Sequence, residues 1–96
     1  MTIHFHSEAR KEFFEAVEYY EEQVVGLGDD FVDEVEKVLS VIEQQPNSGA
    51  KVTNKKRRFL VSRFPFGVIY SVKENQIVIY AVMHLRRKPG YWKPRT

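Results

Sequence analysis

The sequence of 96 residues contains no cysteine, which excludes a disulfide framework and any metal site built from thiolates. Its apolar runs are too short to span a bilayer, and its first residues form no apolar leader segment. It has neither a glycine-rich phosphate loop nor a G-x-S-x-G nucleophile motif, so no motif supports nucleotide hydrolysis or serine-hydrolase chemistry. We expect a cytoplasmic protein that has no cofactor and does not contact a membrane.

Acidic residues are almost missing from the second half of the chain. Residues 47–96 contain twelve lysines and arginines but only one acid, Glu74, which gives a net charge of +11. Residues 1–46 contain twelve acidic residues and three basic ones, a net charge of −9. Internal ion pairs alone do not require so many cations, because an exposed pair contributes only about 0–1 kcal/mol. The asymmetry favours a basic face for a polyanion or an acidic protein; attraction between the two halves is the alternative.

The chain does contain enough apolar surface for one hydrophobic core. Hydrophobic residues make up 43% of the sequence and aromatic residues 14%, so burial can offset the entropy lost on folding. At this length we expect one domain that spans residues 1–96.

Periodicity predicts one strand at the start of the chain and three at its end. Residues 2–6 alternate two apolar side chains with His4 and His6, the period-two pattern of a half-buried strand. Three later stretches are rich in β-branched and aromatic residues, and only short breaks separate them, so they should be antiparallel neighbours. These stretches are residues 57–64, 68–73 and 76–83. The polar segment before them, residues 47–56, is predicted to be a mobile loop.

Two amphipathic helices are predicted between these strands. Ser7 is the expected N-cap of a helix over residues 8–25, which the segment from Gly26 to Gly28 ends. Asp29 or Asp30 should cap the next helix, which Pro46 ends. We therefore predict an α+β fold in which an antiparallel two-helix hairpin packs on one face of a four-stranded, mainly antiparallel β-sheet, with the N-terminal strand parallel to a later one. The expected core residues are Phe13, Tyr20, Phe31, Val35, Val38, Ile42, Val61, Ile69 and Ile79.

The segment after the last strand carries the strongest candidates for a functional site. His84 can move a proton near neutral pH, Arg86 can neutralise phosphate charge, and Tyr91 can stack on a base or act as a weak acid or base. These three would be the catalytic residues if the protein were a ribonuclease. A solvated charge run with an aromatic cap on the core would explain the same residues. The set expected to contact a target or a nucleic acid is Arg58, Arg63, Arg86, Arg87, Lys88, Tyr91 and Trp92.

Other charged residues carry weaker signals. The basic stretch that includes Lys51, Lys55 and Lys56 would either extend a path for a nucleic-acid backbone or keep a sheet edge from aggregating. His4 and His6 share one face of a strand, but no third ligand accompanies them, so we predict no metal site. The glutamates of the first helix are interpreted as a solvated face: Glu12, Glu15, Glu18 and Glu22.

Four sequence patterns resemble the RelE/ParE superfamily of toxins from type II toxin–antitoxin modules. The first helix contains Ala9, Glu12 and Ala16 followed by the Y-Y-E motif at residues 19–21, and G-L-G-x-x-F covers residues 26–31. Residues 58–70 read R-x-x-V-x-x-F-P-F-x-V-x-Y, and residues 77–92 read I-x-I-x-A-V-x-H-x-x-R-x-P-x-Y-W. The resemblance implies a small bacterial or archaeal toxin of the plasmid-stabilisation type that a cognate antitoxin holds inactive.

This superfamily has two activities, and the resemblance divides between them. Its ribosome-dependent mRNA endonucleases use cations on the sheet, an arginine after the last strand and a C-terminal tyrosine, which Arg86 and Tyr91 match. The cation of their middle strand is Gly67 here, and their strand lysines correspond to apolar or small residues at 60–62. His84 and the F-P-F turn are more similar to the ParE branch, whose studied members poison DNA gyrase. The resemblance favours gyrase over the ribosome and its mRNA, with a non-catalytic nucleic-acid-binding module as a further alternative. Whether the protein forms a homodimer or a hetero-oligomer with the antitoxin stays open.

Overall fold

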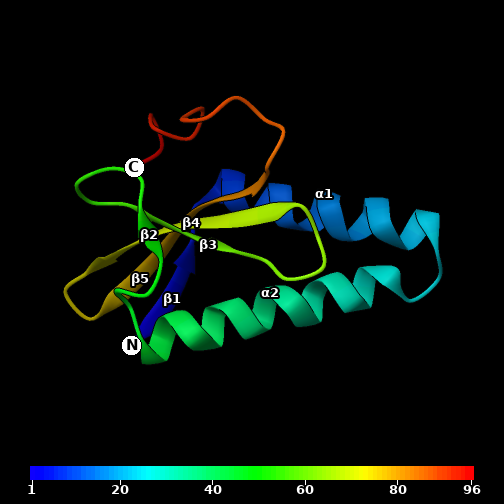
Figure 1. Ribbon diagram of the computed structural model, residues 1–96, viewed down its shortest axis with the longest axis horizontal. Coiled ribbons are helices and arrows are strands. Elements are labelled where there is room, and N and C mark those ends of the chain that lie inside the picture. Colours follow the sequence, from blue (N-terminus) through cyan, green and yellow to red (C-terminus); the bar gives the residue numbers. More distant parts are fainter.

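Two helices cover one face of a five-stranded sheet in the computed structural model, which describes residues 1–96 (Figure 1). The strand order is β1-β5-β4-β3-β2; β1 is parallel to β5 and all other neighbours are antiparallel. No helix is both long and apolar enough to cross a bilayer. The elements are β1 (Thr2–Phe5), α1 (Ser7–Gln23), α2 (Leu27–Gln44), β2 (Ala50–Lys51), β3 (Arg57–Leu60), β4 (Phe66–Lys73) and β5 (Gln76–His84).

This architecture confirms the predicted α+β fold, including the helical hairpin on one face and the parallel first strand. The sheet has one strand more than predicted, because β2 forms within the segment expected to be a loop and pairs with the start of β3. After β2, residues 52–56 form a turn that leads into β3. The hydroxyl of Thr53 accepts the backbone N–H groups of Lys55 and Lys56 at 3.2 and 2.9 Å and so closes it.

Several predicted element ends are wrong. Strand β4 begins at Phe66 instead of residue 68, and helix α1 ends at Gln23 instead of residue 25. The third strand ends at Leu60 instead of continuing to residue 64, and Arg63 adopts a left-handed conformation with φ 71°. The apolar residues that suggested a longer strand are buried because the turn itself folds against the core. Helix α1 begins at Ser7, and its N-cap is His6. Helix α2 begins at Leu27 after Gly26, whose φ of 91° suits glycine, so the two expected capping aspartates lie within its first turn.

The main core lies between the helices and the sheet and is centred on Phe31. The centre of its ring is between 5.0 and 6.0 Å from those of Phe13, Tyr20, Phe64 and Phe66. Phe13 and Tyr20 are partly buried, whereas the other predicted core residues are buried. Those buried residues are Phe31, Val35, Val38, Ile42, Val61, Ile69 and Ile79.

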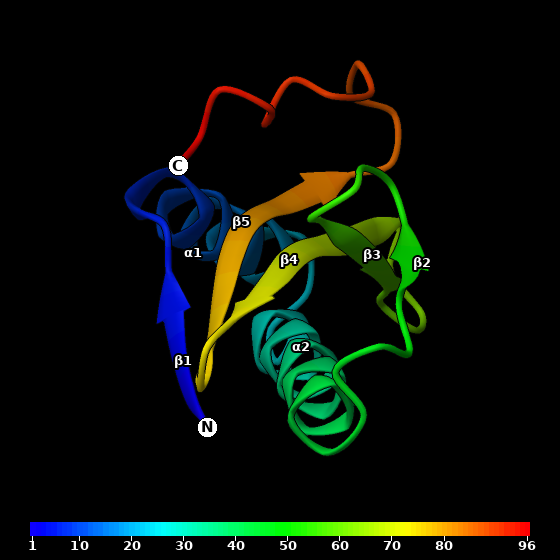
Figure 2. The ribbon, with the colours of Figure 1, turned by 90° about the vertical axis from the view of Figure 1, so that its left-hand side faces the viewer.

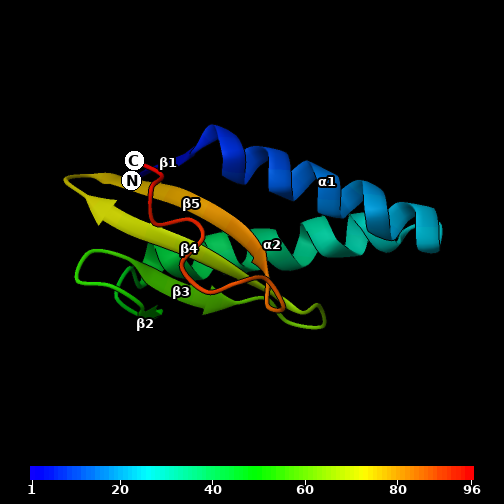
Figure 3. The same cartoon turned by 90° about the horizontal axis from the view of Figure 1, so that it is seen from above.

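A second, smaller core covers the opposite face of the sheet. A β-bulge shifts the register of β4 and β5, so that Ile69 pairs with Ala81 and the next residue of β4 pairs with Ile79. Tyr80 is the extra residue, and it lies in the same cluster as Ala81. The C-terminal segment, residues 85–96, folds back across this face (Figure 3), and the indole of Trp92 completes the cluster.

Replacing Phe31 by alanine is expected to lower the free energy of unfolding by about 3–5 kcal/mol, because the substitution leaves a cavity among four aromatic rings. Phe14 provides a matched control, since its side chain is 53% exposed. Urea denaturation of both variants measures the difference, and equal losses for Phe31→Ala and Phe14→Ala would contradict the assignment of the core.

Candidate target-binding surface

The C-terminal segment brings the sequence-predicted candidates onto the outer face of the sheet. It leaves the end of β5 at His84 and runs back across the sheet toward the β1 side (Figure 2). Trp92 anchors it, because its side chain is only 3% exposed and packs on the outer core. The predicted contact between Trp92 and a target is therefore replaced by a contact with the protein's own sheet, and its buried indole N–H has no hydrogen-bond partner.

The carboxylate of Glu12 is the centre of the contacts that hold this segment. Its Oε1 accepts the backbone N–H of Val82 at 3.0 Å and Nη1 of Arg95 at 2.9 Å. Its Oε2 accepts the hydroxyl of Tyr91 at 2.7 Å, Nη2 of Arg95 at 3.0 Å and Nη1 of Arg87 at 3.1 Å. The Glu12 side chain is 11% exposed, and two guanidinium groups compensate its charge. Such a junction is costly to break, because removing one partner leaves the others buried and unpaired.

The junction also covers the free edge of β5. Strand β1 ends at Phe5, opposite Ile79, so β5 has no neighbouring strand on that side from Tyr80 onward. Arg95 donates to the carbonyl oxygen of Tyr80 at 2.9 Å, and Glu12 accepts from the next outward-facing N–H group. Side chains thus satisfy the backbone groups that a strand would otherwise pair.

The hydroxyl of Tyr91 points toward the protein interior and is held there. The hydroxyl donates to Glu12. The ring also lies against two guanidinium groups: Cζ of Arg87 is 3.7 Å from the ring centroid, and Cζ of Arg95 is 5.0 Å from it. Burial, and after it the hydrogen bond to the Glu12 carboxylate, raises the pKa of Tyr91 well above its ordinary value of 10.0. The phenol is therefore a poor acid or base at neutral pH.

His84, Arg86 and Lys88 lie together where β5 ends. The ring of His84 packs edge-on against Phe66 with centroids 5.1 Å apart, and its Nδ1 accepts the backbone N–H of Arg86 at 3.1 Å. The side chains of Arg86 and Lys88 are exposed, and neither forms an ion pair within the protein. These two cations are available to a target, whereas Nδ1 of His84 is hydrogen-bonded within the turn.

Arg58 reaches the same region from β3. A Cβ atom built at Gly67 would lie 3.1 Å from Cγ of Arg58, so the arginine stem crosses the space that a side chain at position 67 would take. Arg58 then lines a cavity of about 290 Å³ together with Arg87, Leu85 and other residues of the C-terminal segment. A cation therefore does reach this end of the sheet, although β4 itself supplies none there.

Arg63 does not belong to this cluster. Its guanidinium pairs with Asp30 at 3.3 Å and with Glu34 at 3.6 Å, which joins the turn before β4 to helix α2. The structure therefore places Arg58 and Arg87 on one cavity, with Arg86 and Lys88 on either side of Arg87 in the chain, whereas Arg63 is paired with helix α2. No group of three or more histidine, cysteine, aspartate or glutamate side chains gathers around His4 and His6. His6 instead accepts the N–H of Glu8 at 3.1 Å and caps α1.

Sequence reasoning missed Glu12 and Arg95. Glu12 was wrongly interpreted as part of a solvated face, whereas Glu15, Glu18 and Glu22 are indeed exposed. A signal for Glu12 was present: it lies three residues after Ala9 and four before Ala16, which are the two buried residues of α1. It therefore shares the buried stripe with two small side chains that leave room for it. Nothing local marks Arg95, because its partner is 83 positions earlier.

Glu12→Ala is expected to lower the free energy of unfolding by about 3–5 kcal/mol, because two cations, a phenol and a backbone N–H lose their acceptor. The exposed Glu15 is one turn away and serves as the control. Its replacement by alanine should change stability by less than about 0.5 kcal/mol. Chemical denaturation compares the two, and a Glu12 variant as stable as the Glu15 variant would refute the structural role of the junction.

The raised pKa of Tyr91 predicts a specific titration. The folded protein favours the neutral phenol of Tyr91. The contribution of this group to the stability of the fold is therefore complete below pH 10 and is lost as the pH rises above that value. In the ultraviolet titration of phenolate, the difference between the wild type and Tyr91→Phe should show no ionisation step near pH 10. A difference step at pH 10 or below would mean that the hydroxyl is free in solution.

Comparison with known proteins agrees with these observations. Residues 3–89 match the sequence model of a family described as the ParE toxin of the type II toxin–antitoxin system, parDE. No curated protein matches the chain. Among solved structures, the chain is similar to one described as the chromosomal ParDE TA system from P. aeruginosa, with 19% identity, a TM-score of 0.73 and coverage of 90% of this chain and 97% of that chain. At such low identity the structural match supports the fold alone. Because the family match includes most of the sequence, the chain belongs to the ParE toxin family of type II toxin–antitoxin systems.

Proposed function

We propose that this toxin inhibits growth by poisoning DNA gyrase and that an antitoxin encoded beside it neutralises it. The observation that carries the proposal is the hydrogen bond between the hydroxyl of Tyr91 and the carboxylate of Glu12. A ribonuclease of the related branch would need that hydroxyl at its substrate. Here it is committed to the fold, and its raised pKa makes it a poor catalyst.

The arrangement of cations also argues against mRNA cleavage. Phosphate charge that develops in a transition state requires several preorganised donors, and losing one typically costs about 100- to 1000-fold in rate. Of the arginines predicted to contact a target, Arg87 is paired with Glu12, and Arg63 lies away from the end of β5, paired with helix α2. Gly67 provides no side chain, so of the cations in this region Arg58, Arg86 and Lys88 would have to act. This set suits binding better than catalysis.

The proposed gyrase-binding surface consists of Arg58, Leu85, Arg86 and Lys88. Leu85 is 42% exposed and lines one cavity with Arg58, so the surface offers an apolar side chain beside its cations. Arginine and apolar side chains of this kind commonly anchor protein interfaces. Trp92 and Tyr91 support the surface from beneath by fixing the C-terminal segment on the sheet.

A separate apolar groove fits the antitoxin. It lies between α2 and β3, has a volume of about 320 Å³ and includes Val41, Phe59 and Leu60, of which Leu60 is 53% exposed. Strand β2 pairs only with the first two residues of β3, so the edge of β3 is free beside this groove. An amphipathic helix in the groove, or a strand added to the free edge, would bury these side chains. We infer that the antitoxin binds there.

One reconstituted assay tests the target. Purified toxin is expected to inhibit supercoiling by gyrase and to leave mRNA on translating ribosomes uncut. Tyr91→Phe should retain inhibition, because the phenol serves the fold. Arg86→Ala combined with Lys88→Ala should require at least about tenfold more toxin, since both exposed cations are removed. Arg10→Ala with Lys11→Ala, which changes the charge equally on α1, is the matched control and should inhibit like wild type.

The same assay tests the antitoxin groove. Adding the antitoxin should restore supercoiling, and toxin carrying Leu60→Asp should resist this rescue because a charge then occupies the apolar groove. Gyrase would be refuted as the target by two results together: wild-type toxin leaves supercoiling unaffected, and it cleaves mRNA on ribosomes in a way that Arg86→Ala abolishes. Full rescue of the Leu60 variant would refute the groove as the antitoxin site.

A further inference from the structure

The C-terminal segment covers only part of the outer face of the sheet and leaves a basic groove beside it. Two adjoining cavities of about 510 and 440 Å³ form this groove near the tip of the β4–β5 hairpin. No carboxylate side chain lines either cavity. Five residues line both cavities: Asn54, Lys55, Lys56, Ser71 and Lys73. Lys51 and Arg57 also line the first cavity, whereas Arg95, which is paired with Glu12, and Thr96 line the second.

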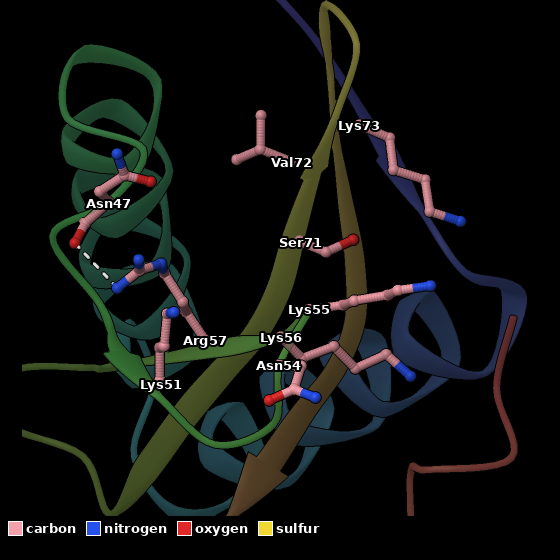
Figure 4. A pocket seen from close by; sticks show the side chains of 9 residues that line it. All are labelled: Asn47, Lys51, Asn54, Lys55, Lys56, Arg57, Ser71, Val72 and Lys73. Carbon is pink, nitrogen blue, oxygen red and sulfur yellow. Dashed lines mark hydrogen bonds between the residues drawn. The ribbon is translucent and has the colours of Figure 1, made fainter.

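Ser71 gives the groove a polar group that the fold does not use. The residue is 4% exposed, and its Oγ has no hydrogen-bond partner in the protein. Figure 4 shows this hydroxyl on the same side of β4 as the ammonium groups of Lys55, Lys56 and Lys73. Burying a hydroxyl without a partner costs free energy, so an unpaired one at the base of a cationic groove indicates a ligand with acceptor atoms.

The cations around Ser71 are partly preorganised. Lys56 donates from Nζ to the carbonyl oxygen of Arg95 at 3.3 Å and lies 4.3 Å from the centroid of the Tyr80 ring. The turn that Thr53 closes fixes the backbone next to it. Lys55 and Lys73 are exposed and form no ion pair. An anion can therefore gain two unpaired ammonium groups, one fixed ammonium group and one hydroxyl donor without displacing an aspartate or glutamate side chain.

We propose that this groove binds the phosphate backbone of a nucleic-acid strand, with one phosphate accepting the hydroxyl of Ser71 between Lys55 and Lys73. Two joined cavities lined by cations suit consecutive phosphates better than a single small anion. The groove offers no exposed aromatic ring for bases, since Tyr80 is buried under Lys56. Recognition is therefore independent of base sequence.

The groove is separate from the proposed gyrase-binding surface. In the register of the hairpin, Lys73 pairs with Gln76 at the tip, whereas Phe66 pairs with His84 at the other end. The two sites are thus at opposite ends of β4. Nucleic-acid binding at the groove does not depend on whether gyrase is the target, and the two are tested with different variants.

Fluorescence anisotropy with a labelled oligothymidylate of about 12 nucleotides tests the proposal over a range of salt concentrations. Each phosphate neutralised on a single strand contributes about −0.7 to the slope of log K against log salt. Lys55→Gln with Lys73→Gln should therefore reduce the slope by about 1.4 and weaken binding about 25-fold at about 0.1 M salt. Arg10→Gln with Lys11→Gln, an equal change of charge on α1, should bind like wild type. If both double variants weakened oligonucleotide binding equally, the effect would come from the net charge of the protein and not from the groove, which would overturn the proposal.

Ser71→Ala separates a specific site from a diffuse basic patch. The hydroxyl has no partner within the protein, so its removal should leave the melting temperature unchanged or slightly higher. Binding of the oligonucleotide should nevertheless weaken about tenfold, which is the effect of one hydrogen bond to a charged acceptor. Ser62→Ala, on the exposed turn before β4, is the control and should bind like wild type. Unchanged binding by the Ser71 variant would overturn the placement of the phosphate.

Competition experiments identify the source of the phosphate. Inorganic phosphate, ATP and polyglutamate are each added to the bound oligothymidylate at equal total charge. The proposal expects all three to displace it much less effectively than unlabelled oligothymidylate. Displacement by ATP or inorganic phosphate at equal charge would instead identify a site for a free phosphate compound. Equal displacement by polyglutamate would identify a site for acidic protein segments, and either result would overturn a nucleic-acid strand as the ligand.

Discussion

The carboxylate of Glu12 joins the first helix, the free edge of β5 and the C-terminal segment, and the position of the whole outer surface depends on this junction. A buried carboxylate is unfavourable by itself and becomes tolerable only when cations and hydrogen-bond donors surround it. Here Arg95, Arg87 and Tyr91 all come from residues 85–96, which have no regular secondary structure of their own. The charge therefore specifies a single path for a segment that backbone hydrogen bonds alone would not fix.

The same junction separates residues that hold the fold from residues that remain available to a partner. Tyr91 and Trp92 have the chemistry of binding residues, but both are committed to interior contacts. Arg86 and Lys88 are left exposed on a turn whose geometry is fixed from both sides. A surface held in this way loses little conformational entropy when it binds, so more of its contact energy contributes to affinity.

Except for the two-residue strand β2, the sequence was sufficient for the order and type of the elements, because helix and strand periodicities follow directly from which faces are buried. It failed where a residue's role depends on distant partners or on irregular backbone. Val61 and Phe64 looked like strand residues, yet they are buried from a turn. The bulge at Tyr80 was invisible, since apolar residues on both sides of it fit an uninterrupted strand. Glu12 was misinterpreted because most helical glutamates are solvated, and the partner that buries it comes from the other end of the chain.

The parallel pairing of β1 with β5 has a consequence for how the toxin is made. The first strand finds its partner only in residues 76–79, and Glu12 finds Arg95 only at the end of the chain. Contacts over such separations form late, because the entropy of closing a long loop must be overcome before they contribute. A growing polypeptide lacks both strand β5 and the segment that covers the sheet until residues 76–96 have been made. A translation product that stops before Arg95 therefore cannot form the junction with Glu12 that positions the outer surface.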